Sequence, residues 1–333
     1  MEHIETLKFL DPQTLATVNS LELRSRMIIE GMMLGQHKSP FQGASVEFAQ
    51  HRQYVTGDDT RHIDWKVFGR SDKLYIKQYQ KETNLDLMIM VDTSGSMAYG
   101  NQNKPASTEE NKYYPWRKFD HASSLAVALA YLGLQQQDRV GLTLFDDHVR
   151  AATRMSSQHN HWRSLVEVLN NEKILGVGKV GTAEFDPHAG RKTDLARIFD
   201  QIVAKQKNRS LIVIISDFFD DPALIENGLA RLFHRRHDVI LFQVMDDDEL
   251  NFPFRSSSEF IGLESEGKIG LDPAMLKKAY KEVMDKQLDD IEKIARKFRF
   301  DYSLVQSSKS IGSSLMKFLN KRSRVVNQRG AAR

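Results

Sequence analysis

The chain has 333 residues, with 47 lysines and arginines against 44 aspartates and glutamates, and it contains no cysteine. This length is enough for one large domain or two smaller ones, either with a substantial core. The lack of cysteine excludes disulfides, thiolate catalysis and metal sites built on cysteine. The formal net charge of +3 is too small to favour nucleic-acid binding.

The hydrophobic runs of the sequence are short. Residues 87–91 and 211–215 fall far below the roughly 20 apolar residues that a membrane-spanning helix requires. The first ten residues also lack the basic segment and apolar core of a secretory signal. We therefore expect a cytoplasmic protein that does not insert directly into a membrane.

Residues 1–83 are expected to form an N-terminal helix followed by a β-rich extension. Asp11 and Pro12 suit the cap and first position of a helix of about twenty residues. From Ser39 to Lys81, alternating apolar residues and glycine-containing turns indicate short strands. One cluster here is expected to tie the extension to the main domain through charge pairs and a buried indole, with a partner surface as the alternative: Arg52, Asp58, Asp59, Arg61, Asp64, Trp65 and Arg70.

Residues 84–321 are expected to form one α/β domain, a doubly wound and mostly parallel sheet with helices on both faces. Compact apolar runs predict strands at 86–91, 139–145, 211–216, 239–245 and 300–305. Apolar residues three and four apart predict helices at 122–132, 162–169 and 195–202. A long helix is expected from Pro273 to about Phe298. Residues 322–333 are expected to form a basic, flexible tail.

Two polar insertions interrupt the alternation of strands and helices. Residues 99–118 are rich in helix breakers, and residues 246–272 open with four acids and then alternate as a short hairpin does. Both insertions are expected at the surface. For 246–249 we expect a solvated loop, with a second cation site as the alternative.

A possible metal site follows the first strand of this domain. Asp92, Ser94 and Ser96 place one carboxylate and two hydroxyls where a buried strand would emerge into solvent. Mg²⁺ prefers oxygen ligands and gives up its waters reluctantly, so this set suits it, with Mn²⁺ or Ca²⁺ as alternatives. The competing interpretation is a polar turn, since Asp, Ser and Gly all favour turns.

Two further residues extend the candidate site. Asp217 ends the strand at 211–216, and Thr193 opens a helix, so a doubly wound sheet would bring both near Asp92. Thr193 also suits a helix cap, and Thr182 is its rival as a ligand. Two close carboxylates repel each other unless a cation lies between them. Some ligands in such sites act through water, so a position would stay open for a carboxylate of a partner protein.

The pattern Asp-x-Ser-Gly-Ser-Met, followed in order by Thr193 and Asp217, resembles the metal-ion-dependent adhesion site of von Willebrand factor A domains. The upstream stretch, including Ser39-Pro40-Phe41, Gly57-Asp58-Asp59 and Arg61-His62-Ile63-Asp64-Trp65, is similar to the bacterial family called domain of unknown function 58. This resemblance implies a non-enzymatic adaptor, without catalytic residues, that works with a MoxR-type AAA+ ATPase in the maturation or assembly of protein complexes.

The alternative to an adaptor is an Mg²⁺-dependent phosphohydrolase with Asp92 as its nucleophile. Enzymes of that kind need a second acid two positions later, where this chain has Ser94. A serine hydrolase is disfavoured because neither Ser94 nor Ser96 lies in a Gly-x-Ser-x-Gly elbow.

Overall fold

The computed structural model describes most of the main domain and parts of the N-terminal region. The described residues are 15, 23–28, 48–55, 60, 63–79, 85–101, 116–171, 198–201, 209–254, 258–261, 268–271, 273–312, 314–318, 320–321 and 324.

The main domain is mixed α/β, built on a six-stranded sheet with the strand order β12-β9-β8-β3-β6-β7. Five of these strands are parallel to one another, and only β7 at the edge runs antiparallel to its neighbour. The strands are β3 (Asp86–Asp92), β6 (Arg139–Phe145), β7 (Val149–Ala152), β8 (Leu211–Ser216), β9 (Asp238–Met245) and β12 (Asp301–Gln306). All five predicted strands are therefore confirmed, each to within one residue at either end.

The central strands are buried on both faces, which explains why their sequences are continuous apolar runs. In β3, Leu87, Ile89 and Val91 belong to one core cluster, whereas Met88 and Met90 belong to another. Side chains alternate between the two faces of a strand, so the sheet separates two hydrophobic cores.

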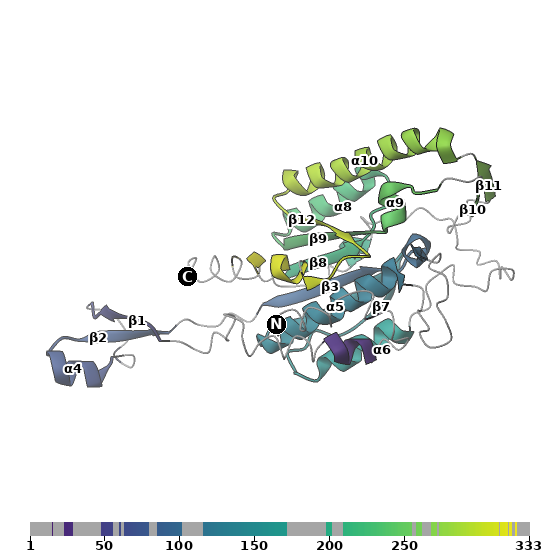
Figure 1. Cartoon of the computed structure of the whole chain (residues 1–333). Helices are drawn as coiled ribbons and strands as arrows, with labels where there is room; N and C mark the ends of the chain where they lie inside the picture. Colours follow the sequence, from purple (N-terminus) through teal and green to yellow (C-terminus); the bar gives the residue numbers. More distant parts are fainter. Residues whose placement is uncertain are drawn as a thin grey trace, which may run out of the picture.

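Helices cover each of these cores. α5 (Lys118–Gln135) and α6 (His161–Asn171) pack on the face of Leu87, while α8 (Pro222–His234) and α10 (Pro273–Lys297) pack on the face of Met88. Figure 1 shows the first pair below the sheet and the second pair above it. The helices predicted at 122–132, 162–169 and 273–298 are confirmed. Of the helix predicted at 195–202, the structure describes residues 198–201, which are helical.

Among the helices that the structure describes, α5 is the most buried, and its sequence is apolar on nearly every side. It approaches β3 and β6 closely at Gly133, where a Cβ atom would lie 2.9 Å from Leu87 Cδ2. The helix begins beside the short pair β4 (Gly100–Asn101) and β5 (Trp116–Arg117), so its first residues lie at the carboxyl edge of the sheet.

The N-terminal region contains a two-stranded antiparallel pair, β1 (Phe48–Gln53) and β2 (Tyr75–Tyr79), joined through α4 (Trp65–Ser71). Asp64 caps α4 by accepting hydrogen bonds from the amides of Lys66 and Val67. The expected buried indole is wrong, because Trp65 is 64% exposed at the first turn of this helix. The predicted N-terminal helix is described at Leu15 and over 23–28, where it is helical.

Other short elements among the described residues are η2 (Gly95–Ala98), α9 (Asp247–Asn251) and the hairpin of β10 (Ser258–Ile261) and β11 (Lys268–Leu271). The hairpin confirms the alternation noted in 246–272. Among the described residues, no helix has the length and apolar character needed to cross a bilayer. The boundary at 83/84 and the basic tail from 322 stay predictions.

Candidate metal centre

Asp92 and Ser216 lie side by side at the carboxyl edge of the sheet. Their strands, β3 and β8, are parallel neighbours with Val91 opposite Ile215, so both chains leave the sheet at the same edge. The Ser216 hydroxyl donates a hydrogen bond to Asp92 Oδ2 and accepts one from the amide of Phe218. Asp217 follows directly, which brings a second carboxylate to this edge.

The loop after β3 turns back onto Asp92. The Ser94 amide donates a hydrogen bond to Asp92 Oδ1 at 2.8 Å, and η2 begins at the next residue. This turn places the hydroxyl oxygens of Ser94 and Ser96 3.1 Å apart, and both side chains are only half-buried. The two hydroxyls thus adjoin the buried carboxylate and remain within reach of solvent.

Burial and a neighbouring acid both disfavour the charged form of the Asp92 carboxyl. Burial, first, and the negative charge of Asp217, second, raise the pKa of the Asp92 carboxyl to about 7, although hydrogen bonds from Ser216 and Ser94 oppose the shift. Two carboxylates in this position are each destabilised by the other. A cation placed between them would remove that destabilisation.

Lys118 also lies at this edge, contrary to the surface position expected for 99–118. It is the first residue of α5, and its side chain is completely buried. The ammonium donates to Asp217 Oδ2 at 2.8 Å and to Glu249 Oε1 at 2.6 Å. A buried ammonium needs such partners because the loss of its hydration is otherwise too costly.

The expectation of a solvated loop at 246–249 is wrong. These residues form the start of α9, with Asp246 as the cap: its side chain accepts from the Asp248 amide, while Glu249 Oε2 accepts from the Asp246 amide. Burial, first, raises the pKa of Glu249 to about 7; Lys118 lowers it and Asp217 raises it. The acidic segment therefore contributes a buried ion pair rather than a solvated face.

A side-chain hydrogen bond and a tight turn fix the backbone around Asp217. Its carbonyl accepts a hydrogen bond from the Gln243 side chain, whose own oxygen accepts from the Tyr302 hydroxyl. Phe218 has a left-handed backbone with φ of 54°, and the chain turns there so that Phe218 is buried but Phe219 is 43% exposed. The Phe219 ring lies 5.0 Å from the Lys118 ammonium and forms an apolar rim beside the carboxylates.

The described residues form a donor set that suits a hard cation. Asp92, Ser94, Ser96 and Asp217 supply carboxylate and hydroxyl oxygens from two adjacent strand ends, and Mg²⁺ prefers such ligands. Thr193 and its rival Thr182 lie outside the described residues. The assignment of all five residues as metal ligands stays a prediction.

Sequence reasoning missed Lys118 and Glu249. The available signal for Glu249 was the spacing Asp246-x-x-Glu249, which is that of a capping box at a helix start. Lys118 closes a polar insertion immediately before an apolar helix, and nothing in that position distinguishes a buried lysine from an exposed one.

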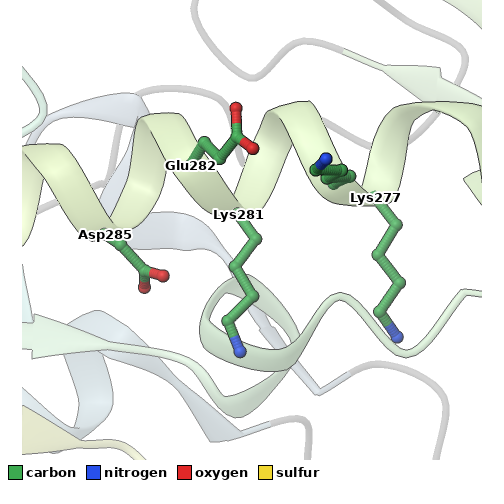
Figure 2. Close-up of a pocket in the computed structure, with 5 residues that line it drawn as sticks. Lys277, Lys281, Glu282 and Asp285 are labelled. Carbon is green, nitrogen blue, oxygen red and sulfur yellow. The ribbon is translucent and has the colours of Figure 1, made fainter.

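Two other charged groupings are explained without a ligand. Asp146, Asp147 and His148 cluster after β6, but Asp146 already pairs with Arg150 and His148 with Asp147. A surface pocket on α10 is lined by exposed charged side chains of that helix alone, and Figure 2 shows Lys277 and Lys281 projecting from the same side of it as Asp285. Neither shares a residue with the candidate metal centre.

Residues 50–289 match the family described as "Protein of unknown function DUF58". Uncharacterized proteins from Mycobacterium bovis and from two strains of Mycobacterium tuberculosis are 26% identical over 245 residues, covering 73% of this chain and 68% of theirs. The names of these relatives assign them no function.

Two solved structures are similar at low sequence identity. The conserved hypothetical protein BatB from Bacteroides thetaiotaomicron is 16% identical, with a TM-score of 0.46 over 73% of this chain and all of that one. An aerotolerance-related membrane protein from Bacteroides fragilis is 17% identical, with a TM-score of 0.38 over 75% of this chain and all of that one.

Proposed function

Because this chain belongs to the DUF58 family, whose function is unknown, we propose a role for it from its own site: a non-enzymatic adaptor that binds a partner protein through a divalent metal ion. The observation that carries the proposal is the meeting of Asp92 and Asp217 at adjacent strand ends beside the paired hydroxyls of Ser94 and Ser96.

In this proposal the domain is doubly wound like a von Willebrand factor A domain, and its carboxyl edge is a metal-ion-dependent adhesion site. Asp92, Ser94, Ser96, Asp217 and Thr193 would hold Mg²⁺, with Mn²⁺ or Ca²⁺ as alternatives. A bound ion of this kind supplies an open coordination position that accepts a carboxylate oxygen from the partner. The exposed ring of Phe219 beside the carboxylates would contact the partner around that acid.

The partner we propose is a MoxR-type AAA+ ATPase, in the maturation or assembly of protein complexes. This part rests on the family resemblance alone. The geometry contributes a narrower requirement, namely that the partner present an Asp or Glu side chain that can reach a half-buried site.

A chelation experiment with the full chain tests the adaptor. The immobilised chain captures a purified MoxR-type ATPase in the presence of Mg²⁺, and we expect EDTA and Asp92→Ala each to release it. The matched control is Asp238→Ala, because Asp238 begins β9 at the other end of the sheet and pairs with Arg209 on the surface. Capture that survives both chelation and Asp92→Ala would contradict the proposal.

The phosphohydrolase alternative predicts a different result. The purified chain would then hydrolyse a phosphate monoester with Mg²⁺, and Asp92→Ala would abolish turnover. Enzymes of that kind need a second acid two residues after the nucleophile, and this chain has Ser94 there. Metal-dependent turnover lost in Asp92→Ala would replace the adaptor with an enzyme.

A further inference from the structure

Lys118 holds one of the carboxylates that the metal ion is proposed to use. Its ammonium lies 2.8 Å from Asp217 Oδ2 and is completely buried, so this contact is shielded from water and salt. Oδ1 of the same carboxylate accepts from the Phe219 amide. A divalent ion that uses Asp217 must therefore contend with a positive charge already bonded to it.

The charges of the four groups do not balance. Asp92, Asp217 and Glu249 carry three negative charges when ionised, against the single positive charge of Lys118, and Asp217 acts electrostatically on both other acids. This excess can accommodate a divalent ion in addition to the ammonium. Among the described residues, the groups that act on Asp92 are Ser94, Ser216 and Asp217, none of which is a cation.

Glu249 is a second acceptor for the Lys118 ammonium, and contacts other than Asp217 hold it in position. Its Oε1 accepts from Lys118 at 2.6 Å, while its Oε2 is held by the Asp246 amide in the capping box of α9. Asp246 is in turn held by the Ser307 hydroxyl at 2.6 Å, at the end of β12. Glu249 can therefore keep Lys118 when Asp217 turns to a metal ion, without any rearrangement of the helix.

We propose that Lys118 is an internal counter-cation that sets the metal affinity of this site, competing with the divalent ion for Asp217, while Glu249 draws the ammonium away and so favours metal binding. This inference rests on the proposed metal site and adds to it two residues with opposite effects. Lys118 and Glu249 are positioning residues here, since each acts on the metal through Asp217 rather than as a ligand.

The test is the affinity of the full chain for Mg²⁺ by calorimetry and for Mn²⁺ by electron paramagnetic resonance. We expect Lys118→Met to bind the ion about tenfold more tightly or better, since tenfold corresponds to only about 1.4 kcal/mol of relieved repulsion. We expect Glu249→Gln to bind it more weakly than the wild type, because the ammonium is then left to Asp217 alone.

Three further variants control for misfolding and for a general effect of surface charge. Lys118→Met leaves two buried acids without their shared cation, which can destabilise the fold. The double variant Lys118→Met/Glu249→Gln removes one charge of each sign, so we expect it to fold more stably than Lys118→Met. We also expect it to bind the ion more tightly than the wild type. Lys297 and Glu226 form a comparable ion pair on the surface, and Lys297→Met and Glu226→Gln are expected to leave the affinity unchanged.

The outcomes separate this inference from the proposed function. Equal affinity in the wild type and Lys118→Met, or tighter binding by Glu249→Gln, overturns the counter-cation while leaving the metal site standing. Loss of binding in both Lys118→Met and the double variant, with binding intact in the wild type, shows that Lys118 supports the site and also overturns the inference. No binding by any of the chains overturns the inference and the metal-dependent adaptor together.

Discussion

The His121 side chain is fully buried near the start of α5, where its ring lies edge-on to the indole of Trp116 with centroids 6.2 Å apart. Burial disfavours the charged imidazolium and lowers the pKa of His121 to about 4. The unfolded chain has an ordinary histidine there, with a pKa of about 6.5. Between these two pH values the unfolded state therefore binds a proton that the folded state does not.

This difference predicts an acid-sensitive contribution to stability. The contribution of His121 is retained above pH 6.5 and is lost as the pH falls toward 4, by about 2 kcal/mol between pH 7.5 and pH 5 from proton linkage. His121→Gln should remove this part of the pH dependence, so the gap between the unfolding free energies of wild type and variant should shrink at pH 5. Urea denaturation at both pH values measures it.

His148 provides the control for this experiment. Its side chain is 53% exposed in the loop after β6, so the same substitution there removes a histidine without removing a buried one. A gap that stays constant with pH for His121→Gln, or that shrinks equally for His148→Gln, would show that burial of His121 does not govern the effect.

At the scale of elements, α9 shows how a five-residue helix is kept in place. A helix of this length is unstable in isolation, because it forms too few hydrogen bonds to offset the conformational entropy lost when its first turn is fixed. Asp246 compensates by accepting hydrogen bonds from the Asp248 amide and the Ser307 hydroxyl, and Glu249 accepts one from the Asp246 amide. The helix thus depends on a few named contacts.

Asp246→Ala is expected to destabilise the protein by about 1–3 kcal/mol, since it removes a helix cap and leaves the buried Ser307 hydroxyl without its acceptor. Asp247→Ala, one position along in the first turn, should change the free energy of unfolding by less than about 0.5 kcal/mol. Both are measured by urea denaturation at pH 7.5. Equal losses in the two variants would mean that the cap does not hold α9.

Sequence patterns predict the strands of this fold well where a strand is buried on both faces of the sheet. The five parallel strands are buried on both faces and read as unbroken apolar runs, so their limits are visible in the sequence. β7 has only four residues, none of them buried, and no apolar run marks it. Around Trp65 the alternating pattern suggests a strand, but the Asp64 cap and the following residues form α4 instead.

At the scale of the whole molecule, the candidate site is assembled from contacts between distant parts of the chain. Ser216 and Asp92 are 124 positions apart, and Lys118 and Glu249 are 131 apart. The strand ends of a parallel sheet follow from topology, which is why Asp92 and Asp217 can be placed together from sequence. The Lys118 contact depends on where two irregular insertions fold, and no periodicity encodes that.

Magnesium should stabilise the whole domain if Asp92 and Asp217 share it. A ligand that binds only the folded state adds about 2.7 kcal/mol to the free energy of unfolding at one hundred times its dissociation constant. We therefore expect Mg²⁺ to raise the melting temperature of the full chain and EDTA to reverse the rise. A bound cation would offset the two effects that raise the pKa of Asp92 in the folded state, burial first and the negative charge of Asp217 second.

Asp92→Asn separates this effect from general binding of cations to an acidic surface. The amide keeps nearly the shape of the carboxylate but removes its charge, so the magnesium-dependent rise in melting temperature should disappear. Asp238→Asn removes one negative charge from the opposite end of the sheet, and it should leave that rise intact. If instead Asp92→Asn and the wild type respond equally to Mg²⁺, the ion stabilises the protein from some other surface, because the carboxylate pair at the ends of β3 and β8 then plays no part in holding it.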